Sequence, residues 1–183
     1  MSQRLDNTQW YAELFHKFEN RLATSADDLA YRRNAIKDLT AIGFPGSRDE
    51  EWRDTSLSSF FSEKFVPSFD DLSSFREIKS LLEVGIESHR IVFVDGHLQE
   101  SLSDFDSLQP VLKVSSNVPV SSDISAKVRD TVSVSDNDKS FFLLNSAMTF
   151  NSTNVLISEK SRIEKPIEFV FIALGDQVCS HPR

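Results

Sequence analysis

At 183 residues, 39% of them hydrophobic and 15 of them Phe, the chain can bury one ordinary core or a small domain and the start of a second, which excludes global disorder. Its net charge of -8 disfavours binding to nucleic acids and anionic membranes, because phosphate contacts need clustered cations. Cys179 is the only cysteine, so we expect no intramolecular disulfide and a reducing compartment, by default the cytoplasm. We expect no membrane role and no targeting segment, because no stretch of ~18 apolar residues is present and the first residues are not continuously apolar.

Two helices are predicted at the start of the chain. Apolar residues recur at helical spacing in the stripe Trp10–Leu22, with Asn7 or Thr8 as the cap. A second helix is predicted over residues 27–42, capped by its first residue and ended by Gly43. The two would form an antiparallel hairpin. Its aromatic stripe favours a core role, and a partner-binding groove is the alternative.

Two charged clusters have structural explanations. Arg32 and Arg33 are predicted to lie on a solvated helix face. Glu50 and Glu51 precede Trp52, and paired carboxylates can serve acid/base chemistry or bind a metal, which would suit a hydrolase. Adjacent residues point in different directions in a helix or a strand, so a structural role is favoured, with Trp52 buried and the charges solvated or paired.

Residues 56–71 are rich in Phe and Ser and are predicted to be an irregular connector whose Phe side chains pack on a neighbour. Residues 90–99 are predicted to form a hairpin around the Asp95-Gly96 turn. A strand is predicted over 111–114, and helices are predicted over 123–132 and 139–149.

The last third of the chain predicts two strands, over residues 155–158 and 167–173, with a turn between them. No later segment has the pattern of a partner for the outer strand. Because an unpaired apolar edge promotes aggregation, we expect a partner segment to be missing from this chain.

Residues that could carry chemistry are scattered. With 5 Gly the chain offers no Gly-rich phosphate loop, and no Ser lies in a nucleophile elbow. Its four histidines are not at metal-chelating spacing: His16, His89, His97 and His181. Cys179 and His181 form a C-x-H pair, yet two ligands cannot complete a structural metal site, and a lone Cys is usually a small buried hydrophobic residue. We therefore expect no catalytic, cofactor-binding or metal-binding residues, and no enzyme.

Several segments in a fixed order resemble a known family. They are "GFP" at 43–45, "EEWRDTSL" at 50–57, "IVFVDGHLQESLS" at 91–103, "FFLLNSAMTFNSTNVLISEKSRIEKPIEFVFIA" at 141–173 and "HPR" at 181–183. Together they are similar to the N-terminal part of the SufB/SufD family, in its SufD branch, which serves the SUF iron-sulfur cluster assembly system. The resemblance runs from about residue 10 to the last residue.

The resemblance implies an α+β chain: an N-terminal helical domain with its connector (1–89), a mixed α/β segment (90–150) and the truncated first turns of a right-handed parallel β-helix (151–183). It implies a non-enzymatic scaffold of the SufBCD complex that acts through protein–protein interaction. The SufB-like scaffold and the SufC-like ATPase would bind beyond Arg183.

The resemblance also implies where the iron-sulfur cluster is handled. In the family this is a property of the full complex, at a Cys of SufB and a His of SufD that lie further along the solenoid. The role therefore does not pass to Cys179 or His181. The alternative to the scaffold is a free-standing small protein-binding module that uses the Trp10–Leu22 helix face.

Overall fold

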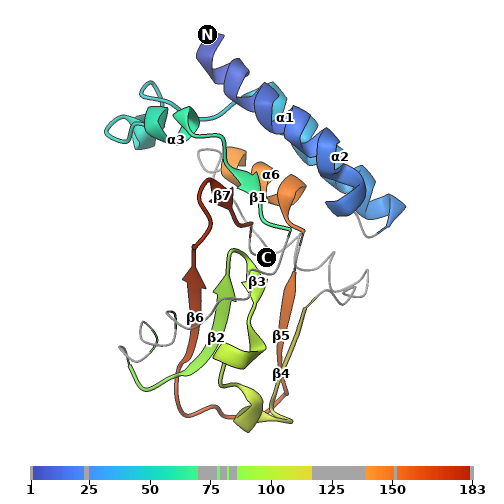
Figure 1. Cartoon of the computed structure of the whole chain (residues 1–183), viewed down its shortest axis with the longest axis vertical. Helices are drawn as coiled ribbons and strands as arrows, with labels where there is room; N and C mark the ends of the chain where they lie inside the picture. The colour runs from blue at the N-terminus through green and yellow to red at the C-terminus, as the bar shows by residue number, and fades with distance from the viewer. Residues whose placement is uncertain are drawn as a thin grey trace. The chain divides into compact units, whose positions relative to one another are not determined.

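The computed structural model describes residues 2–22, 25–69, 78, 82, 86–116, 139–150 and 152–181. The chain forms two compact units, each built from two stretches: Met1–Val66 with Pro119–Phe150 (unit 1), and Pro67–Val118 with Asn151–Arg183 (unit 2). Helices dominate the described part of unit 1 and strands that of unit 2 (Figure 1), which confirms the predicted α+β class. The sequence predicts three successive domains, over residues 1–89, 90–150 and 151–183. This division stays a prediction.

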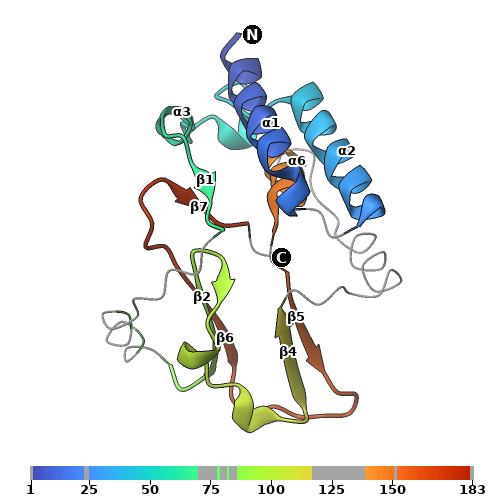
Figure 2. The same cartoon turned by 45° about the vertical axis from the view of Figure 1, so that its right-hand side comes forward.

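Unit 1 is built on the helices α1 (Ser2–Leu22), α2 (Ala26–Ile42) and α6 (Lys139–Met148). The first two run antiparallel as a hairpin, as predicted, and α6 packs against α2 (Figures 1 and 2). The predicted helix over 139–149 is confirmed to within one residue at its end. The most buried large side chains of the unit are Phe15, Leu22, Leu39, Phe44 and Met148.

Most of the stripe on α1 is core. Tyr11, Leu14, Phe15 and Leu22 are buried and do not line an open groove, whereas Trp10 and Phe18 are partly exposed. The predicted cap was wrong, because α1 begins at Ser2 and both Asn7 and Thr8 lie inside it. Thr8 is instead packed into the buried face of the helix, at 1% exposure.

The N-terminal cap of α2 differs from the prediction. Ser25 has an extended backbone, and its hydroxyl accepts a hydrogen bond from the Asp28 amide at 3.1 Å. The predicted cap, Asp27, lies in the first helical turn, where its negative charge suits the helix dipole. Gly43 ends the helix as predicted, with φ 75, a conformation that suits a residue without a Cβ.

Arg32 is buried, so the prediction that it lies on a solvated face was wrong. Its Nε donates to the Asp28 carboxylate at 2.8 Å, and its Nη1 donates to the carbonyls of Ala147 and Thr149. Those carbonyls lie at the C-terminal end of α6, where helical carbonyls lack partners within the helix. Arg33, by contrast, is exposed as predicted and pairs with Glu19 at 3.0 Å.

The segment after α2 packs its aromatic rings into one cluster. It contains the short helices η1 (Glu50–Trp52) and α3 (Ser58–Ser62), so the prediction of an irregular backbone was wrong for the second of these. The predicted packing of Phe side chains is confirmed by the ring of Phe44, which contacts those of Phe61 and Phe141. Trp52 stacks on Phe141 at 5.4 Å but is only half-buried, less than predicted.

The described strands of unit 2 are β2 (His89–Val94), β3 (His97–Leu98), β4 (Leu112–Ser116), β5 (Thr153–Ile157), β6 (Ile167–Ile172) and β7 (Val178–Cys179), with η2 (Glu100–Leu102) and η3 (Asp106–Leu108) between them. The short β1 (Val66–Pro67) spans the boundary of the units. One sheet has the order β3-β2-β6, and β4 pairs antiparallel with β5. The predicted helix over 123–132 lies outside the described residues.

The predicted hairpin over 90–99 is confirmed. β2 and β3 pair antiparallel around Asp95 (φ 47) and Gly96 (φ 88), and two consecutive residues with positive φ form the tight turn that Asp-Gly sequences favour. The core of unit 2 centres on four buried residues, Ile91, Phe93, Phe105 and Leu112, and side chains from β4, β5 and β6 pack against it. The strands predicted over 111–114, 155–158 and 167–173 are confirmed with shifts of one or two residues at their ends.

Candidate functional site

The strand β6 lies parallel to β2, and from Ile91 onward the residues that face each other in its register are apolar. Ile91 is opposite Phe169, and Phe93 is opposite Phe171. The rings of Phe93 and Phe171 are stacked, with centroids 5.0 Å apart and planes 16° apart. Contacts between aromatic side chains on neighbouring strands of this kind add to the stability of the strand pair.

The side chains of β6 alternate between its two faces, and three of them continue the apolar face of β2. Ile167 packs onto the core of unit 2, whereas Phe169 is 48% exposed and Phe171 is 54% exposed. Within the part of the chain that the structure describes, β6 pairs with β2 along one edge and has no strand on its other edge. We call Phe169, Phe171 and the exposed Leu174 the β6 face.

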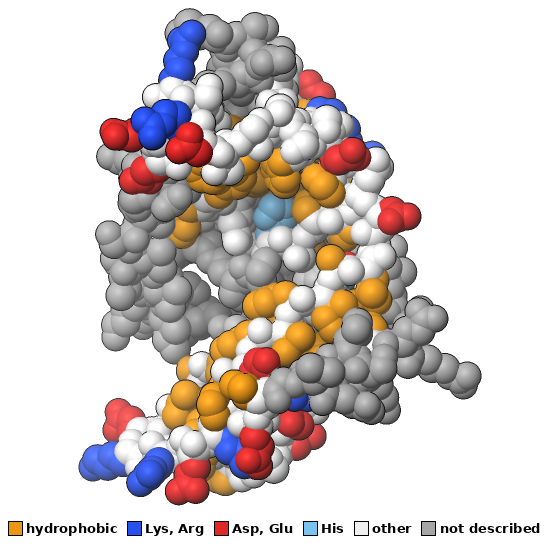
Figure 3. All heavy atoms as spheres, turned by 90° about the vertical axis from the view of Figure 1, so that its left-hand side faces the viewer, with side chains coloured by type: hydrophobic (Ala, Val, Ile, Leu, Met, Phe, Trp, Pro, Cys, Tyr) orange, Lys and Arg blue, Asp and Glu red, His pale blue; other side chains and the backbone are white. Residues whose placement is uncertain are grey.

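The space-filling view supports this reading of β6. Figure 3 shows hydrophobic side chains gathered in an oblique band on the strand-rich unit, flanked by charged side chains at its lower end. On β5 the exposed large hydrophobic residues are Leu156 and Ile157. Exposed apolar clusters of this kind are typical of surfaces that are covered by another polypeptide segment.

A polar ladder fixes β6 onto β2. Arg90 Nε donates to the Glu168 carboxylate at 3.1 Å, and the Ser88 hydroxyl donates to the same carboxylate oxygen at 2.7 Å. The bonds from Ser88 and Arg90 lower the pKa of Glu168. Lys165 and Glu87 form a further ion pair at 2.6 Å, just before the two strands begin. These contacts set the strand register and leave the β6 face open.

Asp95 joins the β2-β3 turn to the end of β6. Its Oδ1 accepts a hydrogen bond from the Leu174 amide at 2.8 Å, and its Oδ2 accepts one from the Gly175 amide at 3.2 Å. The sequence assigned Asp95 a turn role only, which its positive φ confirms. The second role could not be read from the sequence, because its partners lie about 80 residues away and are backbone amides, which leave no residue signature.

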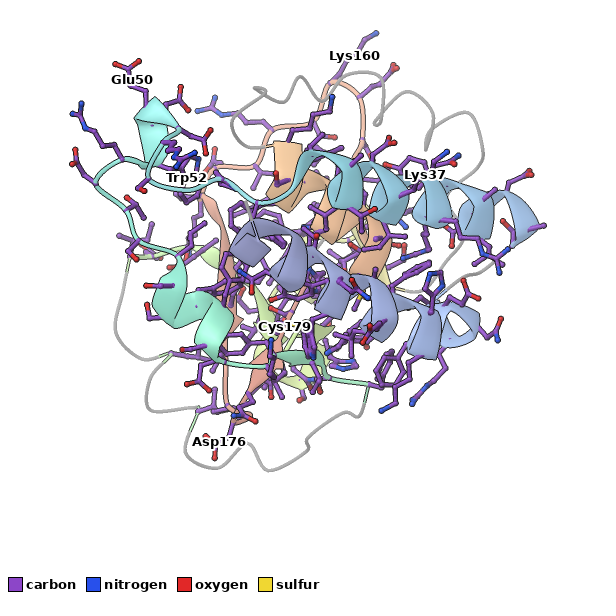
Figure 4. All side chains as sticks on the ribbon, turned by 90° about the horizontal axis from the view of Figure 1, so that it is seen from above. Lys37, Glu50, Trp52, Lys160, Asp176 and Cys179 are labelled. Carbon is purple, nitrogen blue, oxygen red and sulfur yellow. The ribbon has the colours of Figure 1, made fainter. Side chains whose placement is uncertain are left out.

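The residues considered for chemistry come from both units. Glu50 and Glu51 are exposed on η1, and Figure 4 shows Glu50 pointing outward while Trp52 lies on the opposite side of that helix. In the described part of the chain, no group of three or more His, Cys, Asp or Glu side chains is arranged to hold a metal ion. The expectation of no catalytic, cofactor-binding or metal-binding residue stays a prediction.

Cys179 and His181 are the exception to this scatter, because the structure brings their side chains together. The Cys179 Sγ lies 3.4 Å from the His181 Nε2, and both residues are partly buried. Burial raises the pKa of the Cys179 thiol to about 11 and lowers the pKa of the His181 imidazole to about 4. Both groups are therefore neutral near pH 7, and the thiol is not an activated nucleophile.

Comparison with known proteins gives the chain its family. The model of the SufBD protein N-terminal region matches residues 5–169, which is most of the chain. The chain belongs to the SufB/SufD family. It is also 23% identical, over 180 residues, to a protein of Synechocystis sp. (strain ATCC 27184 / PCC 6803 / Kazusa) described as an iron-sulfur cluster assembly SufBD family protein.

The chain covers only part of that relative. The alignment takes in 96% of this chain and 40% of the Synechocystis protein. Among the helices that the structure describes, none combines the length and the apolar character needed to cross a membrane.

Proposed function

We propose that this chain is a SufD-type, non-enzymatic scaffold segment that acts in iron-sulfur cluster assembly together with a SufB-like scaffold and a SufC-like ATPase. The observation that carries the proposal is the family match over residues 5–169. The cluster is the cargo of the complete assembly, and none of this chain's residues is assigned to hold it. The cytoplasm, as a reducing compartment, suits both the cargo and the single Cys179.

The same proposal includes the fold of unit 2, which we take to be the start of a right-handed parallel β-helix. Three features support it: the parallel β2-β6 pair, the stacking of Phe93 on Phe171, and the open β6 face. Right-handed crossovers between parallel strands are strongly preferred, which gives the hand. In a solenoid each coil buries its face against the next, so the β6 face is the surface on which a further coil would stack.

The rival function, a small binding module that uses the Trp10–Leu22 stripe, is not favoured by the structure. Tyr11, Leu14 and Phe15 are buried within unit 1 and are needed for its core. A partner could reach these three side chains only if the packing around them opened. We therefore place partner binding outside this stripe.

The experiment that tests the scaffold proposal is affinity capture of the native gene product from its own cells at low salt, followed by mass spectrometry. We expect a SufB-like protein and a SufC-like ATPase in amounts comparable to the captured chain. A variant with Lys37→Glu, on the exposed side of α2, serves as the matched control and should capture both partners equally. Absence of both partners from the wild-type capture would count against the scaffold function.

A further inference from the structure

We draw no further inference here: the strongest candidate, the half-exposed β6 face along the edge of the β3-β2-β6 sheet, belongs to the surface for which a further coil is already proposed, and nothing in the structure shows what else covers it.

Discussion

Replacing Arg32 by Met should destabilise unit 1 more than any change at its neighbour Arg33. The Arg32 side chain is 9% exposed, and it donates to the Asp28 carboxylate and to the carbonyls of Ala147 and Thr149. Met fills much of the same volume but donates nothing, so the carboxylate and two carbonyls lose their partner. Breaking a buried ion pair from one side costs about 3–5 kcal/mol.

A loss of that size is large against the total stability of about 5–15 kcal/mol that is typical of a folded protein. For a chain of this length, 3 kcal/mol corresponds to a fall in Tm of about 6–12 °C. Far-UV circular dichroism during heating and urea unfolding measures it directly. The α-helical signal should report it, because the bonds of Arg32 join α2 to the end of α6.

Arg33→Met is the matched control, one residue away on the same helix. Its ion pair with Glu19 is exposed and screened by solvent, so its loss should leave Tm nearly unchanged. Arg32→Lys tests whether the positive charge alone is sufficient for stability. Lys keeps the charge but cannot donate to three acceptors in the planar arrangement of a guanidinium. Equal effects of the two Met substitutions would refute the role assigned to Arg32.

Three further changes probe unit 2. Asp95→Ala should lower the free energy of unfolding by about 2–4 kcal/mol, because it removes the hydrogen bonds to the Leu174 and Gly175 amides and puts a positive φ on a residue that disfavours it. Urea unfolding measures this loss, and an unchanged midpoint would show that Asp95 does not hold the end of β6. Gly96→Ala should lower Tm through its φ of 88 and its approach to Ser180, and a wild-type Tm would contradict both. The lowered pKa of Glu168 stabilises the fold above the ordinary carboxyl pKa, and this contribution is lost as pH falls through the lower folded value. In Glu168→Gln the free energy of unfolding should therefore fall less steeply between pH 6 and pH 3 than in the wild type. Identical pH profiles would show that the hydrogen bonds of Glu168 to Ser88 and Arg90 do not stabilise the fold.

Much of the fold could be predicted because its signals are local. The Asp95-Gly96 turn, the stop at Gly43 and the alternating residues of β6 each depend on a few neighbours in sequence. The family could be recognised because several short segments occur in a fixed order. The caps were missed by a few residues because several polar residues near each helix start could serve, and packing decides between them.

The errors share a cause. Arg32 and Arg33 are adjacent and chemically identical, and only the approach of α6 from over 100 residues away separates a buried anchor from a solvated side chain. Cys179 and His181 were visible as a C-x-H spacing, but the sequence could not give the 3.4 Å between their side chains or their burial. A pattern along the chain gives the face on which a residue lies, and it does not give what covers that face.

The β6 face follows from the same reasoning. The alternation of Ile167, Phe169 and Phe171 predicts one apolar side of a strand, and the structure places that side above the matching side of β2. Ile167 is partly buried on the core, whereas the two Phe side chains remain about half exposed, so the strand continues the core without closing it. At ~25 cal/mol per Å² and roughly 75–125 Å² for half of a Phe side chain, covering both would contribute about 4–6 kcal/mol. That gain favours covering the β6 face with a further strand, whose backbone hydrogen bonds would add to it, and the β-helix is accordingly the fold we propose for this part of the SufB/SufD chain.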